Sequence, residues 1–276
     1  MPQTMTSLLK DDEISFFLEL IRRAGQIAVA MRATVDIREK SGPMDQVTTA
    51  DLELSRILVD EISRAYPHDT VVSEEDAELG DIPQTGRVWM IDPIDGTNNY
   101  IKNDGQYAVM IGLLIDAVPV FGFVYAPAEQ TAYYGGPGFG AWKWADKADP
   151  VKFAPLETLT LEDRVRLMMG FRDRKRHPWI ERLPKVQLIR TGSIGIKVAW
   201  VLEGRADLFV HMAGKLKTWD TAGPVSIALA NGLDVGTIDI DELKFELPSI
   251  LHETSVIIGR QGSLKWCRHF LLEPQE

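Results

Sequence analysis

Cysteine is almost missing from this sequence of 276 residues. Cys267 is the only one, so an intrachain disulfide is impossible and a metal site built from thiolates is excluded. Histidine is also sparse, and no two of the five histidines have the spacing of a zinc site. They are His68, His177, His211, His252 and His269. We therefore assign no cysteine or histidine to a metal.

Long apolar runs and positive charge are lacking as well. No run approaches the ~18 residues that span a bilayer, and Met1 to Asp12 lack the apolar core of a signal peptide. We therefore expect a cytoplasmic protein without a membrane partner. Lysine and arginine number 30 against 40 aspartates and glutamates, a net charge of −10, which argues against a nucleic-acid partner. No G-x-S-x-G motif is present, which disfavours a Ser-His-Asp hydrolase.

The most informative stretch is acidic and follows an apolar run. Val88–Ile91 predicts a buried strand, and Asp92, Pro93 and Asp95 come directly after it. Pro93 restricts the backbone and Gly96 permits a sharp turn, so both carboxylates can converge on one point. Two converging carboxylates repel each other unless a cation lies between them, and such oxygen ligands suit Mg²⁺, Mn²⁺ or Ca²⁺.

The residues after these carboxylates predict the start of a short helix. Gly96, Thr97 and Asn98 would offer free backbone N–H groups and a hydroxyl, which together form a phosphate cradle. The alternative is an Asx-turn in which one aspartate only caps the next segment. Because such a turn needs just one of these polar residues, the whole motif favours the metal and phosphate interpretation.

The remaining chain predicts alternating helices and strands. Apolar residues at helical spacing predict helices at 14–31 and 193–203. A further helix is predicted to begin with Thr48 or Thr49 as its N-cap. Strands are expected at 107–115 and 118–125, and a hairpin around Gly135–Phe139. The polar stretch 146–163 is the best place for a boundary. We therefore divide the chain into an N-terminal subdomain, 1–150, that carries most of the acidic motifs, and a C-terminal subdomain, 151–276, that completes the site.

Three motifs in order resemble those of the inositol monophosphatase superfamily. Asp92–Thr97 is similar to its signature, with Val72–Glu75 upstream and Trp219–Gly223 downstream, and the resemblance spans Ile14 to Gly259. It implies an α/β fold, the α-β-α-β-α sandwich shared with fructose-1,6-bisphosphatases. It also implies a Mg²⁺-dependent phosphomonoesterase with about two or three ions, for which Mn²⁺ is a possible substitute, and it raises the expectation of a homodimer.

The resemblance also implies roles for individual residues. The metal ligands would be Glu74, Asp92, Asp95, Asp220 and the main-chain carbonyl of Ile94. Glu74 would touch the attacking water, and Asp51 would pair with Thr97 to activate it. Gly96, Thr97 and Asn98 would bind the substrate. From the residues alone, Asp51 and Asp220 could equally be acidic residues that stabilise helix starts.

The motifs point to more than one substrate. Thr97–Tyr100 keeps the polar-then-aromatic pattern of inositol monophosphatases, whereas Val124–Pro127 and Lys217 look more like bisphosphate nucleotidases. Lys217 could meet a second phosphate, and so could Arg172 in the basic run Phe171–His177, which otherwise reads as a solvated loop. We rank a 3'(2'),5'-bisphosphate nucleotide such as 3'-phosphoadenosine 5'-phosphate first, inositol monophosphate second and a sugar bisphosphate third. A non-catalytic binding protein on the same fold is the alternative outside enzymes.

Overall fold

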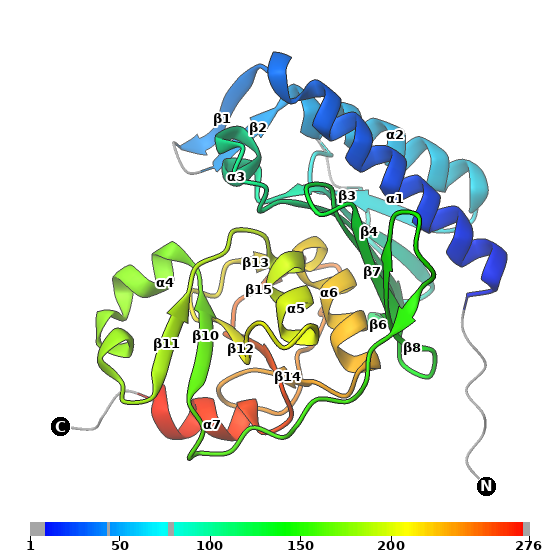
Figure 1. Ribbon diagram of the computed structural model, residues 1–276. Helices are drawn as coiled ribbons and strands as arrows, with labels where there is room; N and C mark the ends of the chain where they lie inside the picture. The colour runs from blue at the N-terminus through cyan, green and yellow to red at the C-terminus, as the bar shows by residue number, and fades with distance from the viewer. Residues whose placement is uncertain (1–8, 43–44, 77–79, 273–276) are drawn as a thin grey trace, which may run out of the picture.

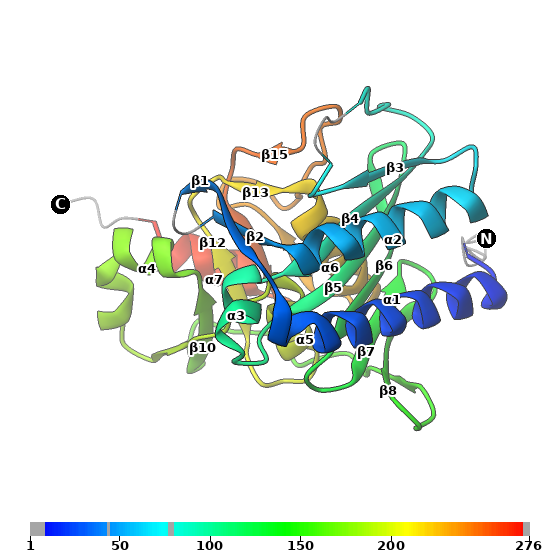
Figure 2. The same ribbon diagram turned by 90° about the horizontal axis from the view of Figure 1, so that it is seen from above.

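Two long helices form the outer layer of the fold. The computed structural model describes residues 9–42, 45–76 and 80–272. In it α1 (Asp11–Met31) and α2 (Thr49–Ala65) lie side by side over one face of a sheet (Figures 1 and 2). The side chain of Thr48 caps α2 by accepting hydrogen bonds from two backbone amides. Both predicted helices and the predicted cap are confirmed.

Aromatic side chains pack α1 against the sheet. The ring of Phe17 stacks on Trp89 with centroids 4.3 Å apart and on Phe123 at 5.0 Å. All three side chains are buried, and each such ring contact adds about 0.5–1.5 kcal/mol to the effect of burial. These contacts hold α1 on the strand that carries Asp92.

The sheet beneath these helices has seven strands in the described part of the chain. Their order is β3-β4-β5-β6-β7-β8-β9, with β3 and β4 parallel and the other neighbours antiparallel. The hairpin of β7 and β8 encloses Pro137–Phe139, which confirms the hairpin predicted around the glycine cluster. The strands are β3 (Thr70–Ser73), β4 (Arg87–Asp95), β5 (Ala108–Ile115), β6 (Val118–Ala126), β7 (Thr131–Gly136), β8 (Gly140–Ala145) and β9 (Val151–Lys152).

Buried helices α5 (Ile194–Leu202) and α6 (Thr218–Ala230) form the middle layer. Three glycines allow α6 to lie directly on β5 and β6. A Cβ on Gly112 would lie 2.4 Å from the backbone nitrogen of Gly223, and one on Gly122 would lie 2.1 Å from its carbonyl oxygen. Any side chain at these two sheet positions would therefore push α6 away from the sheet.

A second sheet and α7 complete the layers. The strand order is β11-β10-β12-β16-β14, and α7 (Ser263–Phe270) packs against β14 and β16 near the bottom of Figure 1. The predicted α-β-α-β-α sandwich is confirmed. The strands are β10 (Val165–Met169), β11 (Val186–Ile189), β12 (Leu208–His211), β14 (Asp234–Gly236) and β16 (Val256–Gly259); smaller elements are η1 (Arg32–Thr34), β1 (Ile37–Gly42), β2 (Asp45–Thr48), η2 (Pro178–Arg182), β13 (Leu216–Lys217) and β15 (Leu251–His252).

The basic run after β10 differs from its prediction. Its interpretation as a loop is wrong, because Phe171–Arg176 forms the short helix α4. Asp173 anchors this helix, since it is buried and its Oδ2 lies 3.1 Å from Nδ1 of His211 on β12. One side of α4 therefore faces the protein, and the basic residues are divided between that side and solvent.

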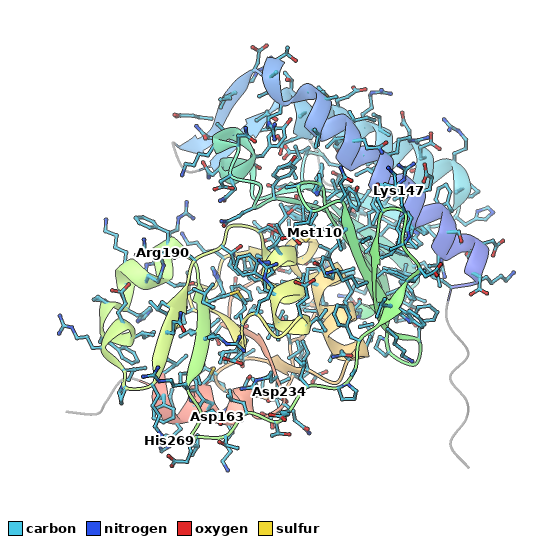
Figure 3. The ribbon with its side chains drawn as sticks, in the orientation of Figure 1. Met110, Lys147, Asp163, Arg190, Asp234 and His269 are labelled. Atoms are coloured by element: carbon cyan, nitrogen blue, oxygen red, sulfur yellow. The ribbon has the colours of Figure 1, made fainter. Side chains whose placement is uncertain are left out.

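Hydrophobic packing crosses residue 150. One buried cluster includes Met110 of β5, labelled in Figure 3, Val225 of α6 and Phe209 of β12. The division into 1–150 and 151–276 stays a prediction. Within the ranges that the structure describes, no helix has both the length and the apolar character needed to cross a membrane.

Candidate active site

Asp92 and Asp95 lie near the end of β4, in the middle of the sheet. β4 pairs with β5 as far as Asp92 and again at Asp95, with an irregular register between them. Pro93 has no backbone N–H to donate to the ladder, which accounts for the break. The strand is thus longer than predicted, and the sharp turn falls at Gly96, whose φ is +93°. The two carboxyl side chains are buried, with residue exposures of 2% and 6%.

The surroundings of Asp92 are strongly unfavourable for an unpaired negative charge. Its Oδ1 is buried and has no hydrogen-bond partner among the described residues. Burial raises the pKa of Asp92 well above its usual range, and the charges of Glu74, Asp95 and Asp220 raise it further. An unsatisfied buried acceptor costs about 1–3 kcal/mol or more, so a cation at this position would stabilise the site.

Asp95 is held by the first turn of α5. Ser193 caps the helix, and its Oγ donates a hydrogen bond to Oδ2 of Asp95. The N–H of Gly195 donates to the same oxygen at 2.8 Å. Burial raises the pKa of Asp95, while the Ser193 hydrogen bond and the charge of Lys197 act in the opposite direction. These donors fix the carboxylate orientation.

Asp51 and Thr97 are brought together, as the sequence predicts. Oγ1 of Thr97 donates to Oδ1 of Asp51 at 3.1 Å and also lies 3.2 Å from the carbonyl oxygen of Ile94. The other carboxylate oxygen accepts from the N–H and Oγ1 of Thr48 at 2.9 and 2.5 Å. Burial raises the pKa of Asp51, against the effect of these hydrogen bonds. Both oxygens of Asp51 therefore already accept hydrogen bonds, one of them from Thr97.

Glu74 and Asp220 approach this region from two other elements. Glu74 directly follows β3, and its N–H donates to the carbonyl of Ile91 at 3.0 Å. Asp220 lies in the first turn of α6, where its Oδ2 accepts from the N–H of Lys217 at 2.6 Å. Burial and then the charge of Glu74 raise the pKa of Asp220 well above its usual range. We call Glu74, Asp92, Asp95 and Asp220 the acidic cluster.

The acidic cluster suits a hard divalent cation. Among the residues that the structure describes, no three His, Cys, Asp or Glu side chains are arranged to hold a metal ion by themselves. Mg²⁺ does not require such a cage, because it usually keeps several waters and binds one or two carboxylates together with substrate phosphate. The unpartnered Oδ1 of Asp92 is an oxygen donor of this type. The residues therefore fit Mg²⁺ with a shell completed by water and substrate.

Lys197 is a buried cation that the sequence patterns did not identify. It lies on α5, is 4% exposed, and donates from Nζ to the carbonyl oxygens of Gly192 and Ser193. Burial lowers the pKa of Lys197 to about 8, against the effect of the charges of Asp95 and Asp220. A lysine inside the apolar run of α5 is the signal that could have revealed it, since buried lysines are rare.

A cavity of about 600 Å³ lies beside the acidic cluster. It is bounded by α3 (Thr97–Lys102), by α4 and by the segment between β11 and α5, where Figure 3 labels Arg190. Its charged lining is mostly positive, with one acidic residue, Asp104. We call this space the basic cavity, after its four basic side chains: Lys102, Arg174, Arg190 and Lys197.

The predicted substrate-binding residues are divided by the structure. Asn98 lines the basic cavity, and Gly96 is the N-cap of α3. Arg172 is exposed on α4 and Lys217 is the N-cap of α6, and neither lines the cavity. The cavity instead takes Arg174 from α4, a member of the basic run considered for a second anionic group, and Arg190 from the segment after β11, which the sequence patterns did not single out.

Comparisons with known proteins identify the relatives of this chain. The family model described as the inositol monophosphatase family matches residues 10–269. A 3'(2'),5'-bisphosphate nucleotidase CysQ of Aggregatibacter actinomycetemcomitans is 27% identical over 98% of this chain and 99% of its own length. A fructose-1,6-bisphosphatase/inositol-1-monophosphatase of Thermotoga maritima is 31% identical over 80% of this chain and 84% of its own.

A solved structure shows the same fold. An IMPase/NADP phosphatase complexed with Mg²⁺ and phosphate superposes with a TM-score of 0.76 at 19% identity, covering 95% of both chains. The family match extends over nearly the whole chain and includes every element that carries the acidic cluster. The chain therefore belongs to the inositol monophosphatase family, whose members are phosphatases.

Proposed function

We propose that this phosphatase uses Mg²⁺ and water to hydrolyse a 3'(2'),5'-bisphosphate nucleotide such as 3'-phosphoadenosine 5'-phosphate. The observation that carries the chemistry is the buried, unpartnered Oδ1 of Asp92 beside three further carboxylates. Such a concentration of buried negative charge supports a role in which divalent cations are bound.

The acidic cluster and the carbonyl of Ile94 would hold the ions. When bound, Mg²⁺ lowers the pKa of a water ligand and neutralises charge on the leaving oxygen. Asp95 is already oriented by α5, and Asp220 by the first turn of α6. The protein thus supplies carboxylates in fixed positions before the substrate arrives, which limits the reorganisation that the reaction requires.

Thr97 would orient the attacking water. Oγ1 of Thr97 carries one hydrogen, and both Asp51 and the carbonyl oxygen of Ile94 lie within its reach. If the carbonyl of Ile94 serves as a metal ligand, this hydrogen is donated to Asp51. The lone pairs of Oγ1 then remain to accept a hydrogen bond from water. As the water loses its proton, Thr97 can take it while passing its own to Asp51, whose pKa is raised by burial.

The substrate itself would lie between the acidic cluster and the basic cavity. The amides of Gly96 and Thr97 and the side chain of Asn98 would bind the phosphate that is cleaved, as predicted from the sequence. The basic cavity, of about 600 Å³, has the size of a small-molecule site. Phe171 lines it while remaining 63% exposed, which suits stacking with a planar base.

Inositol monophosphate is the second candidate. Thr97–Tyr100 lies in α3 beside the site, and its sequence resembles that of inositol monophosphatases more than that of nucleotidases. The Thermotoga maritima relative carries both a sugar-bisphosphatase and an inositol-monophosphatase name. A sugar bisphosphate, the third candidate, would also bring a second phosphate to the basic cavity.

Phosphate release from a panel of substrates tests the proposed function. The wild-type protein is assayed with 3'-phosphoadenosine 5'-phosphate, inositol 1-phosphate and fructose 1,6-bisphosphate, in Mg²⁺ and in EDTA. We expect turnover only with Mg²⁺ and the highest kcat/KM for the nucleotide. A higher kcat/KM for inositol 1-phosphate would move the assignment to the second candidate, and no turnover of any compound would favour a non-catalytic protein.

A further inference from the structure

All four main-chain polar groups of the turn before α5 are hydrogen-bonded. The turn consists of Gly192 and Ser193, shortly after Arg190 in Figure 3. The N–H of Gly192 donates to the side-chain oxygen Oε1 of Gln106 at 2.8 Å, and the N–H of Ser193 lies 3.3 Å from the main-chain oxygen of Gln106, to which it donates. The carbonyl oxygens of Gly192 and Ser193 accept hydrogen bonds from Nζ of Lys197. One glutamine and one lysine therefore satisfy the whole turn.

The same turn is closely packed against the start of α3. A Cβ on Gly192 would lie 2.3 Å from Cγ of Asn99, and a Cβ on Gly96 would lie 2.9 Å from the main-chain oxygen of Gln106. Real Cβ atoms essentially never come so close to another atom. The first turn of α3, the loop that carries Gln106 and the turn before α5 are therefore in direct contact, without room for a side chain at either glycine.

Asp104 fixes the loop that carries Gln106. Its two carboxylate oxygens accept hydrogen bonds from the side chain of Asn99 at 2.7 Å and from the N–H of Gln106 at 2.9 Å. The loop joins α3 to β5, and β5 pairs with the strand that carries Asp95. Gln106 is thus held by local hydrogen bonds, and its side chain links this loop to the turn before α5.

The turn matters for the acidic cluster because it holds Asp95. Oγ of Ser193 donates to Oδ2 of Asp95, and the N–H of Gly195 donates to the same oxygen at 2.8 Å. If the turn shifted, both donors would shift with it, and the carboxylate would lose its orientation. A displacement of about 1 Å at a reacting site can cost on the order of 100-fold in rate.

We propose that Gln106 is a positioning residue for Asp95 and acts through Gly192 and Ser193. The inference rests on the proposed function, in which Asp95 helps to hold the metal ions. Gln106 lines the basic cavity, but its side-chain oxygen is occupied by Gly192, so we assign it no contact with the substrate. Residues that orient metal ligands typically contribute about 10- to 100-fold in metal affinity or activity. Because the turn supports the acidic cluster, its loss should affect monophosphates and bisphosphates alike.

Binding of Mn²⁺ in the absence of substrate tests the positioning role. Gln106→Met removes the side-chain acceptor at nearly the same length, Gln106→Glu keeps an acceptor oxygen, and Gln26→Met is the matched control because Gln26 is exposed on α1. By calorimetry we expect the Kd for Mn²⁺ to rise roughly 10-fold or more in Gln106→Met and to stay within about 3-fold of the wild type in the other two. Equal Kd values for Gln106→Met and the wild type would overturn the proposal.

Phosphate release gives a second measurement. We expect Gln106→Met to lower kcat roughly 10- to 100-fold for 3'-phosphoadenosine 5'-phosphate and inositol 1-phosphate alike. Each KM should stay within about 3-fold of the wild type, because no substrate contact is lost. A raised KM with an unchanged kcat would show a direct contact between Gln106 and the substrate, and would overturn the positioning role.

Hydrogen exchange separates this inference from the proposed function, because it requires neither metal nor substrate. In the metal-free wild type the amides of segment 190–195 should be protected, and in Gln106→Met they should exchange roughly 10-fold faster or more, while the rest of the chain is unchanged. This result supports the inference even if the wild type hydrolyses no compound. Unchanged exchange, or faster exchange spread over the whole chain, would overturn it even if the wild type hydrolyses the nucleotide.

A shorter side chain is the second variant if Gln106→Met does not fold. Gln106→Asn keeps the amide group but is one methylene shorter, which takes the oxygen out of reach of Gly192. The same changes in the Kd for Mn²⁺ and in the exchange of segment 190–195 are expected. Wild-type values in Gln106→Asn would overturn the proposal.

Discussion

The acidic cluster and the basic cavity are neighbours with opposite charge and different construction. The carboxylates of the cluster come from the ends of β3 and β4 and from the start of α6. Asp95 accepts hydrogen bonds from the hydroxyl of Ser193 and the N–H of Gly195, and Asp220 accepts one from the N–H of Lys217. The cavity takes its cations from the short helix α4, the segment after β11, the far end of α3 and the buried helix α5. We call the acidic cluster with its supporting elements the rigid half of the site and the basic cavity the open half. The two halves meet along α3.

This difference indicates a division of tasks. Chemistry at a phosphate requires carboxylates held in fixed positions, which buried strand ends provide. Recognition of the rest of a substrate can use exposed side chains such as Arg190. The segments that carry such side chains can vary without disturbing the sheet. Changes to the acidic cluster should affect all substrates alike, whereas changes to the basic cavity should affect only those that reach it.

The strongest test of the rigid half is the contact between α6 and the sheet. Gly122→Ala would place a methyl group 2.1 Å from the carbonyl oxygen of Gly223, and neither backbone can move easily. We expect a loss of roughly 1–3 kcal/mol or more in the free energy of unfolding and a fall in activity on every substrate, because Asp220 moves with α6. Urea unfolding measures the first effect and phosphate release the second.

Gly80→Ala is the control for this change. No atom lies within 4 Å of a Cβ at Gly80, so its stability should stay within about 0.5 kcal/mol of the wild type. Equal stabilities of Gly122→Ala and the wild type would show that α6 is not held by this contact.

Thr97 tests whether the rigid half works through one hydroxyl. Thr97→Val keeps the shape but removes the hydrogen bond to Asp51, and we expect kcat to fall about 100-fold for monophosphates and bisphosphates alike. Thr97→Ser keeps the hydroxyl and should retain most activity. A kcat that falls for one substrate class only would place Thr97 in recognition instead of water activation.

His252 lies outside both clusters and should give the smallest effect, on stability alone. Burial lowers its pKa to about 4, below the ordinary 6.5, and the charge of His211 acts in the same direction, while a backbone hydrogen bond with Lys244 opposes it. Below pH 6.5 the unfolded chain takes up a proton that the folded protein refuses, so stability falls as the pH falls from 6.5 towards 4. Between pH 7 and 5 this group should cost roughly 2 kcal/mol.

Comparison with His252→Gln isolates that contribution. As the pH falls from 7 to 5, the wild type should lose roughly 2 kcal/mol more of its free energy of unfolding than the variant, because the variant lacks the titrating group. Parallel curves for both proteins across this range would contradict a buried neutral imidazole. Phosphate release at pH 7 should be similar in both, since His252 contacts Thr221 and, among the described contacts, none joins it to Asp92, Asp95 or Asp220.

Sequence patterns predicted the rigid half better than the open one, for a physical reason. Each carboxylate of the acidic cluster follows an apolar strand or begins a helix. Its position can therefore be predicted from the neighbouring sequence and the motif. The cations of the basic cavity are separated by long stretches of chain and meet only in the folded protein. Lys217 and Arg172 were chosen for their neighbours in sequence, yet the turn of α4 directs Arg174 into the cavity and leaves Arg172 exposed.

Two local differences have similar causes. The basic run 171–177 contains no apolar periodicity that predicts a helix, and α4 depends on the contact between Asp173 and His211 of a distant strand. β4 extends past Pro93 because β5 continues beside it and pairs with Asp95. Neither partner can be identified from the local sequence.

A Mg²⁺ titration of phosphate release by the wild type and Asp92→Asn tests the central claim most directly. The substrate is the best one for the wild type, and melting in EDTA checks that the variant is folded. We predict Mg²⁺-dependent turnover by the wild type and a loss of about 1000-fold or more in the variant, since several kcal/mol of charge stabilisation depend on the ion. The same Mg²⁺ dependence and rate in both proteins would contradict the assignment of the acidic cluster as the metal site.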